Sequence, residues 1–234
     1  MRGLLVSAAA ISFALPALAD GVLPIPDVYD WTGVYVGGQV GWAWSQTDTT
    51  TTQSTTGAFI GSGTDDRNNF RGGGQIGYDF MALPGVVVGA RATLLWGAST
   101  PTTYSSATGA NVSTSSSTGD IGGTVNARLG YAFGDFLPYA TGGWAWADET
   151  ATRTQVAGVT GLATPGTIEQ EGVFRNGWNL GAGLEYRLWS NWTVFGEYRY
   201  AQFGAASVTF PLAERTDVSS TSSNTVNFGV NYKF

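Results

Sequence analysis

The stretch that decides the fold is Gly33–Ser45, GVYVGGQVGWAWS, in which apolar side chains recur at alternate positions. Val34, Val36 and Trp42 fall on one face of an extended chain, whereas Gln39 and several glycines fall on the other. Successive side chains of a β-strand point to opposite faces. The alternation therefore predicts a strand with one apolar side.

The same alternation recurs seven more times along the chain, which predicts eight strands. The connections after the second, fourth and sixth strands are short: Met81–Gly85, Gly134–Leu137 and Trp189–Asn191. The other connections are long and rich in Ser, Thr, Gly and Asp: Thr47–Asn69, Ala98–Asp120, Ala147–Gly172 and Gly204–Ser223. Short turns at one rim and long loops at the other are typical of an all-β, eight-stranded antiparallel up-and-down transmembrane β-barrel. We expect Ser/Thr tracts in the loops, such as residues 49–52, to be mobile and solvated.

Aromatic residues collect near both ends of the predicted strands. The loop-side group contains Trp42, Trp44, Trp96, Trp144, Trp146 and Trp178, and the turn-side group contains Tyr78, Tyr131, Trp192 and Tyr232. Such residues favour the interfaces between a bilayer and water. In most strands the groups are about eight to ten residues apart, or roughly 25 Å, which fits the apolar band of an outer-membrane barrel. The predicted partners of this outer surface are outer-membrane lipids and lipopolysaccharide.

A soluble β-sandwich is the main alternative, because soluble antiparallel sheets also alternate apolar and polar residues. It would leave the glycine, amide and arginine faces on the outside. It does not explain two aromatic groups or the regular alternation of short and long connections. We therefore favour the membrane barrel.

The face opposite the aromatic residues carries most of the charge. Its charged members are Arg71, Asp79, Arg91, Arg128, Arg175, Glu185, Arg187, Glu197, Arg199 and Lys233. Side chains just fill the interior of an eight-stranded barrel, and burying an unpaired charge costs several kcal/mol. The sequence thus predicts an ion-pair network that plugs the lumen. The alternative is a narrow, wet passage whose basic wall attracts anions.

The first residues have the pattern of an export signal. Arg2 precedes an apolar run, and small residues up to Ala19 form a cleavage site before Asp20. We predict a signal peptide over residues 1–19, cleaved after Ala19, a periplasmic linker over 20–31, and the barrel over 32–234. Pro16 interrupts the apolar run early, which disfavours a membrane-anchoring helix.

The sequence contains no histidine and no cysteine. Disulfides and thiolate metal sites are therefore excluded, as is catalysis that shuttles protons through imidazole. The formal net charge of −6 disfavours a nucleic-acid partner. We expect neither an enzyme nor a cofactor, and we assign no catalytic, cofactor-binding or metal residues.

Two segments carry a family resemblance. Residues 31–42, WTGVYVGGQVGW, resemble the small outer-membrane immunogenic proteins of alphaproteobacteria, a group within the OmpA-like and opacity-porin-like barrel families. Residues 226–234, VNFGVNYKF, are similar to the terminal strand that the barrel-assembly machinery recognises, with Phe234 as the aromatic assembly signal. The resemblance implies an abundant surface barrel of the outer membrane that supports envelope integrity and is sometimes described as porin-like. It supplies no catalytic residues.

Three functions stay open at this stage. The first is a structural barrel that supports the envelope and displays acidic loops, and the second is a small diffusion channel. The third is a receptor or adhesin whose loops bind a host or surface ligand; a haem receptor would need tyrosine ligation here. The pairs Asp65–Asp66 and Glu169/Glu171 could help to hold a divalent cation that bridges lipopolysaccharide. The sequence identifies neither a ligand nor an oligomeric state.

Overall fold

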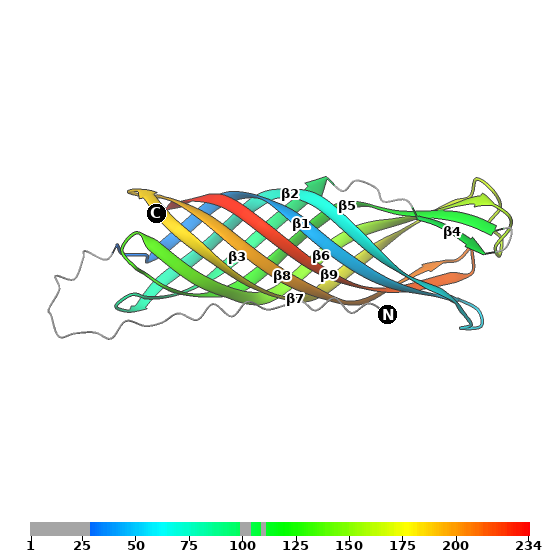
Figure 1. The fold of residues 1–234 in the computed structure, drawn as a ribbon, viewed down its shortest axis with the longest axis horizontal. Coiled ribbons are helices and arrows are strands. Elements are labelled where there is room, and N and C mark those ends of the chain that lie inside the picture. The colour runs from blue at the N-terminus through cyan, green and yellow to red at the C-terminus, as the bar shows by residue number, and fades with distance from the viewer. Residues whose placement is uncertain (1–28, 99–103, 109–110) are drawn as a thin grey trace, which may run out of the picture.

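The computed structural model describes residues 29–98, 104–108 and 111–234. Nearly all of them lie in antiparallel strands (Figure 1). The strands are β1 (Gly33–Gln53), β2 (Phe59–Leu83), β3 (Val86–Ala98), β4 (Tyr104–Thr108), β5 (Asn111–Tyr131), β6 (Phe136–Ala157), β7 (Ile168–Trp189), β8 (Trp192–Phe210) and β9 (Arg215–Lys233). Across these ranges, the structure contains no helix that could span a membrane. The predicted signal peptide over 1–19 and most of the predicted linker lie outside the described residues.

Eight of the strands close into a ring. The hydrogen-bonded order is β3-β2-β1-β9-β8-β7-β6-β5, and pairing of β3 with β5 completes it. Each ring strand lies between its neighbours in sequence, and β9 closes onto β1. The short strand β4 pairs only with β5, beyond the reach of β3. The predicted eight-stranded up-and-down barrel is confirmed.

The pleat of each strand determines which side chains face inward. On β1, Val36 and Trp42 point outward and are exposed, whereas Tyr35, Gln39 and Ala43 are buried in the interior. The other ring strands alternate in the same way. The interior is therefore lined by the predicted polar face, and the apolar face lies outside.

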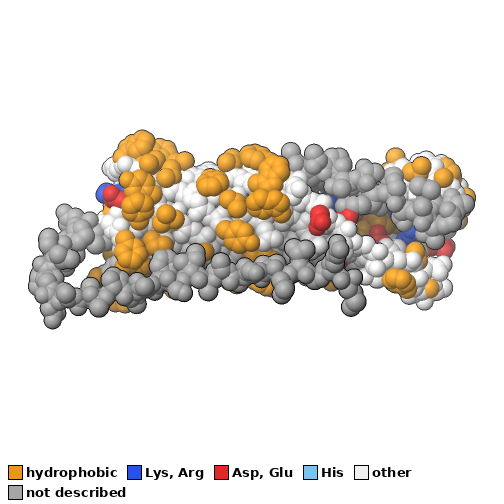
Figure 2. All heavy atoms as spheres, in the orientation of Figure 1, with side chains coloured by type: hydrophobic (Ala, Val, Ile, Leu, Met, Phe, Trp, Pro, Cys, Tyr) orange, Lys and Arg blue, Asp and Glu red, His pale blue; other side chains and the backbone are white. Residues whose placement is uncertain are grey.

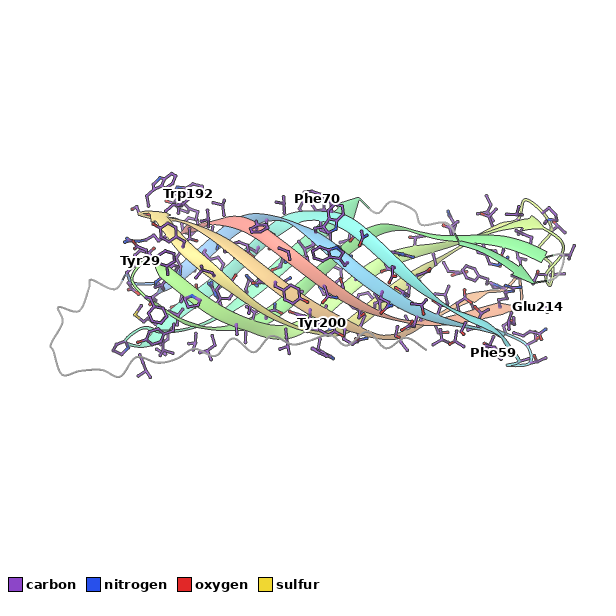
Figure 3. The ribbon with its side chains drawn as sticks, viewed as in Figure 1. Tyr29, Phe59, Phe70, Trp192, Tyr200 and Glu214 are labelled. Atoms are coloured by element: carbon purple, nitrogen blue, oxygen red, sulfur yellow. The ribbon has the colours of Figure 1, made fainter. Side chains whose placement is uncertain are left out.

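On the face that Figure 2 shows, apolar side chains gather in two bands on the outside of the barrel. One band is at the turn-side end, where Trp192 lies, and the other is near the middle of the molecule, where Phe70 and Tyr200 lie (Figure 3). Eight of the predicted belt residues are exposed: Trp42, Trp44, Trp96, Trp144, Trp178, Tyr78, Tyr131 and Trp192. The other two, Trp146 and Tyr232, are half-buried against aromatic neighbours.

The strands run far beyond the second band, which the sequence did not predict. Most of the predicted loop Thr47–Asn69 is a hairpin of β1 and β2, and residues 49–52 pair with both β2 and β9. This tract is therefore strand, and its assignment to a loop is wrong. Threonine is β-branched and suits a strand, and pairing satisfies the backbone polar groups that a loop would leave to water. The predicted loops over 98–120, 147–172 and 204–223 are likewise mostly strand.

We call the described residues within 47–69, 147–172 and 204–223 the crown. Its hairpin ends are joined through the turn between β8 and β9. The backbone N–H of Ser54 donates to the carbonyl of Glu214 at 2.9 Å, and those of Leu162 and Ala163 donate to the carbonyl of Leu212 at 2.6 and 3.0 Å. Beneath this junction lies a small core of Ala163, Val173, Val208, Phe210 and Ala213. The crown is thus a packed structure with its own core.

Candidate functional site in the barrel interior

An ion pair crosses the full width of the barrel. Arg91 on β3 donates from Nη2 to Oε2 of Glu197 on β8 at 2.5 Å, and both side chains are almost fully buried. In the ring of eight strands, β3 and β8 are four positions apart in either direction. Arg199, two residues along β8, donates to the other carboxylate oxygen of Glu197 from Nε at 3.0 Å.

A second chain of charges also joins opposite walls. Arg128 on β5 donates to Asp79 on β2 at 3.2 Å and to Glu185 on β7. The strands β2 and β7 are again four positions apart in the ring. Lys233 on β9 lies 3.0 Å from Asp79 and also donates to the backbone carbonyl of Trp31.

Two tyrosines complete this cluster. The guanidinium of Arg128 lies 3.9 Å from the ring centroid of Tyr139 on β6, which is cation–π geometry. The ammonium of Lys233 lies 5.6 Å from the ring centroid of Tyr35 on β1. Every strand of the ring therefore contributes. We call the following set the lumen network: Tyr35, Asp79, Arg91, Arg128, Tyr139, Glu185, Glu197, Arg199 and Lys233.

Tyr139 can reach the network because its cross-strand partner is a glycine. A Cβ added to Gly183 would lie only 2.7 Å from Cζ of the Tyr139 ring and 2.6 Å from the carbonyl oxygen of Gly196. The tyrosine ring lies over Gly183 and under the guanidinium of Arg128.

The substitution Gly183→Ala should lower the free energy of unfolding by about 1–3 kcal/mol, because the methyl group overpacks the interior. Gly72→Ala is the matched control: a Cβ there would meet nothing nearer than 3.8 Å. Its effect should stay within about 0.5 kcal/mol. The unfolding free energies of both variants are measured by urea titration in lipid vesicles, with tryptophan fluorescence as the signal. Equal effects would show that Tyr139 does not depend on this close contact.

Three of the predicted interior charges lie outside the lumen network. Arg187 is at the turn-side mouth, where it donates to Asp135 at 2.7 Å and stacks on Tyr29. Arg175 lies on β7, donates to the hydroxyl of Ser219 at 2.7 Å and lies 3.5 Å from Glu149, and both of these partners belong to the crown. Arg71 is half-buried on β2. Sequence reasoning missed Asp135 and Glu149 as partners, because both lie in segments predicted as connections.

Sequence reasoning also placed Trp31 in a linker. The structure buries it completely at the turn-side end of the barrel, packed against Val87, Ala132 and Leu137. Its ring meets Tyr29 edge-on at 5.2 Å between centroids. Trp31 and Tyr29 thus pack at the turn-side end of the barrel. No periodicity in residues 20–31 could have indicated this.

The acidic residues considered for a divalent cation are not brought together. Glu169 is buried, lies 3.5 Å from Arg153 and accepts a hydrogen bond from the backbone of Leu212 at 2.8 Å. Elsewhere in the crown, burial raises the pKa of Asp217, although a hydrogen bond from Thr51 and the charge of Arg215 act in the opposite direction. No group of three or more His, Cys, Asp or Glu residues that could hold a metal occurs among the described residues.

The last residue, Phe234, points outward at the turn-side rim and is 71% exposed. Its backbone N–H donates to the carbonyl of Val34 at 2.9 Å, and its ring meets that of Tyr232 edge-on. The chain end is thus fixed to β1 at the seam that closes the ring.

Comparison with known proteins agrees with this architecture. The family model for the outer membrane protein beta-barrel domain matches residues 5–234. The 31 kDa outer-membrane immunogenic protein of Brucella melitensis is 29% identical over 252 residues, covering 100% of both chains. The 25 kDa outer-membrane immunogenic protein of Brucella abortus is 28% identical over 98% of this chain and 96% of that one.

A solved structure shares the fold alone. The outer membrane protease OmpT from Escherichia coli has a TM-score of 0.52 and 10% sequence identity, with 86% of this chain and 97% of that chain covered. The closed ring, its two apolar bands and the full-length family match lead to one conclusion. The chain belongs to the outer membrane protein beta-barrel domain family and is a barrel of the bacterial outer membrane.

Proposed function

We propose that this protein is a structural barrel with an occluded lumen, which supports envelope integrity and displays its crown at the cell surface. The observation that carries the proposal is the Arg91–Glu197 ion pair, which joins opposite walls of the ring. The Asp79–Arg128–Glu185 chain joins another pair of opposite strands. Because each buried charge depends on its partner, moving these side chains aside would cost several kcal/mol.

A gene deletion in the native bacterium tests the proposed role. Loss of the protein should cause detergent sensitivity and membrane blebbing, and the full chain supplied from a plasmid should reverse both. An unchanged envelope after deletion would contradict a role in envelope integrity.

A small diffusion channel is the second candidate, and one observation favours it. The side-chain amides of Gln39 and Asn227 are buried in the interior and have no hydrogen-bond partner within the protein. Buried amides of this kind ordinarily bind water, and a row of waters could conduct small polar solutes. Conductance in a planar bilayer distinguishes the two functions.

We also propose that the protein is not an enzyme. The chain has no histidine, and the interior carboxylates Asp79, Glu185 and Glu197 are each paired with arginine. Each of these carboxylates is thus engaged by a guanidinium, and the chain offers no imidazole with which it could exchange a proton. The similarity to OmpT concerns the fold alone and transfers no activity.

Phe234 is the proposed signal for the barrel-assembly machinery. Phe234→Ala should lower the amount of heat-modifiable barrel in the outer-membrane fraction. Phe133→Ala is the control, because this residue is also an exposed turn-side aromatic (62% exposed) but lies away from the chain end. A loss of equal size in both variants would show that the effect concerns the aromatic band rather than assembly.

A further inference from the structure

Two charged side chains of β9 face the interior of the crown. The cross-strand partners of Arg215 and Asp217 on β8 are Phe210 and Val208, and both of these partners are buried in the small core of the crown. Cross-strand partners lie on the same face of a sheet, so Arg215 and Asp217 face this core as well. Glu214, which precedes Arg215 in sequence, marks this end of the molecule in Figure 3.

A second pair of charges reaches the same place from the opposite side of the crown. Arg153 on β6 and Glu169 on β7 are buried cross-strand partners, with Nη1 3.5 Å from Oε2. The other carboxylate oxygen of Glu169 accepts a hydrogen bond at 2.8 Å from the backbone N–H of Leu212, in the turn that leads into β9. Arg153 also interacts electrostatically with Arg215 and Asp217. We call Arg153, Glu169, Arg215 and Asp217 the crown cluster.

The guanidinium of Arg215 has no partner in the crown cluster. Its Nε is buried and donates no hydrogen bond, and no described carboxylate forms an ion pair with it. Asp217, two residues along the same face, instead accepts a hydrogen bond from the hydroxyl of Thr51 at 2.6 Å. Buried polar groups of folded proteins nearly always have a partner, so an unpaired guanidinium indicates a site for water, an ion or a ligand.

Electrostatics favours an anion over water at this site. Burial lowers the pKa of Arg153, and the positive charge of Arg215 lowers it further. Water would accept hydrogen bonds from the two guanidinium groups but would leave their repulsion in place. An oxyanion accepts the same hydrogen bonds and carries the opposite charge, and the planar fork of arginine matches phosphate and carboxylate groups. The apolar core beside the cluster strengthens this attraction, because charges are poorly screened there.

We propose that the crown cluster binds an oxyanion, in the form of a phosphate or carboxylate group, which Arg215 and Arg153 hold between them. Arg215 is half-buried, so a ligand from outside the cell can reach it. The site lies in the crown and not in the lumen network. The proposal therefore goes beyond the structural role proposed above and does not depend on it.

Inorganic phosphate is the probe, added to the full chain in lipid nanodiscs. The Nε–H signals of isotope-labelled arginines are followed by NMR while phosphate replaces chloride at constant ionic strength. Arg215→Lys and Arg153→Lys each remove one signal and keep the charge, which assigns the two signals. Both signals should shift and reach saturation as phosphate is added. A parallel titration with acetate distinguishes a preference for phosphate from a preference for carboxylate.

Matched variants locate the site. Arg215→Gln should weaken the response of the Arg153 signal about tenfold or more, because one of the two charged donors is lost. Arg67→Gln is the control, since Arg67 is another half-buried crown arginine whose buried Nε has no partner. Arg67 pairs with Ser45 on β1 and Arg215 with Gln53, so roughly 26 Å of strand separates them. The control should leave the affinity unchanged.

The acid of the crown cluster provides a test in the opposite direction. Asp217→Asn should tighten phosphate binding about fivefold, because it removes a charge of the same sign as the ligand. The side chain keeps its shape and can still accept a hydrogen bond from Thr51.

Shifts that do not saturate would overturn the proposal, because they would show only non-specific attraction. An equal response of the Arg153 signal in Arg215→Gln and in the wild type would also overturn it, as would an equal loss in Arg67→Gln. Arg215 has no partner within the protein, so Arg215→Gln should still fold. Heat-modifiable migration on a gel checks that each variant is a folded barrel.

Discussion

The substitution Glu197→Ala should lower the free energy of unfolding in lipid vesicles by about 3–5 kcal/mol. It removes the acceptor for both Arg91 and Arg199, which are 2% and 4% exposed. Two guanidinium groups would then remain buried beside each other with no shared counter-charge. Water entering the lumen would relieve part of this cost, so the barrel should still fold in lipid.

The control is Glu171→Ala, which removes the same chemical group from an exposed position on β7. Its effect should stay within about 0.5 kcal/mol. Glu197→Gln keeps the shape of the side chain and one acceptor oxygen, so its loss of unfolding free energy should lie between those of Glu197→Ala and Glu171→Ala. It also provides a variant that folds if Glu197→Ala does not. If all three unfold at the same urea concentration as the wild type, the lumen network does not stabilise the barrel.

The substitution Trp31→Ala should have an effect of similar size, about 3–5 kcal/mol. The indole is fully buried against Val87, Ala132 and Leu137, so its removal leaves a cavity at the turn-side end. The backbone carbonyl of Trp31 would still accept from Lys233, but the ring that lies 5.3 Å from the Lys233 ammonium would be lost together with the packing. Equilibrium unfolding in vesicles measures the loss.

Trp189→Ala provides the comparison, because Trp189 is a turn-side tryptophan that is 64% exposed. Trp189→Ala should lower the free energy of unfolding clearly less than Trp31→Ala does, since removing an exposed side chain creates no internal cavity. If the two variants lower the free energy of unfolding equally, Trp31 is not part of the packed barrel.

The sequence predicts the barrel well within the bilayer and poorly beyond it. On β1, the alternation of Val36, Gln39 and Trp42 follows from lipid on one side of the wall and a polar interior on the other. Beyond Trp44, water lies outside the wall as well, so threonine and serine occupy both faces. Period-two patterning disappears there although the strand continues to Gln53. The long hairpins were therefore predicted as loops.

The interior charges were predictable as a set, but their pairing was not. The face of each strand places Arg91 and Glu197 in the lumen. Arg91 and Glu197 meet because closure of the ring places β3 opposite β8, and the alternation within one strand does not show this. The partners Asp135 and Glu149 could not be found in this way, because one lies in a turn and the other in a segment predicted as a loop.

Single-channel recording of the purified, full-length protein in a planar bilayer tests the occluded lumen most directly. Two ion-paired chains crossing the ring, together with Trp31 at the turn-side end, predict no steady openings at any moderate voltage. Reproducible openings of constant size by the wild-type protein would contradict an occluded barrel and favour the diffusion channel.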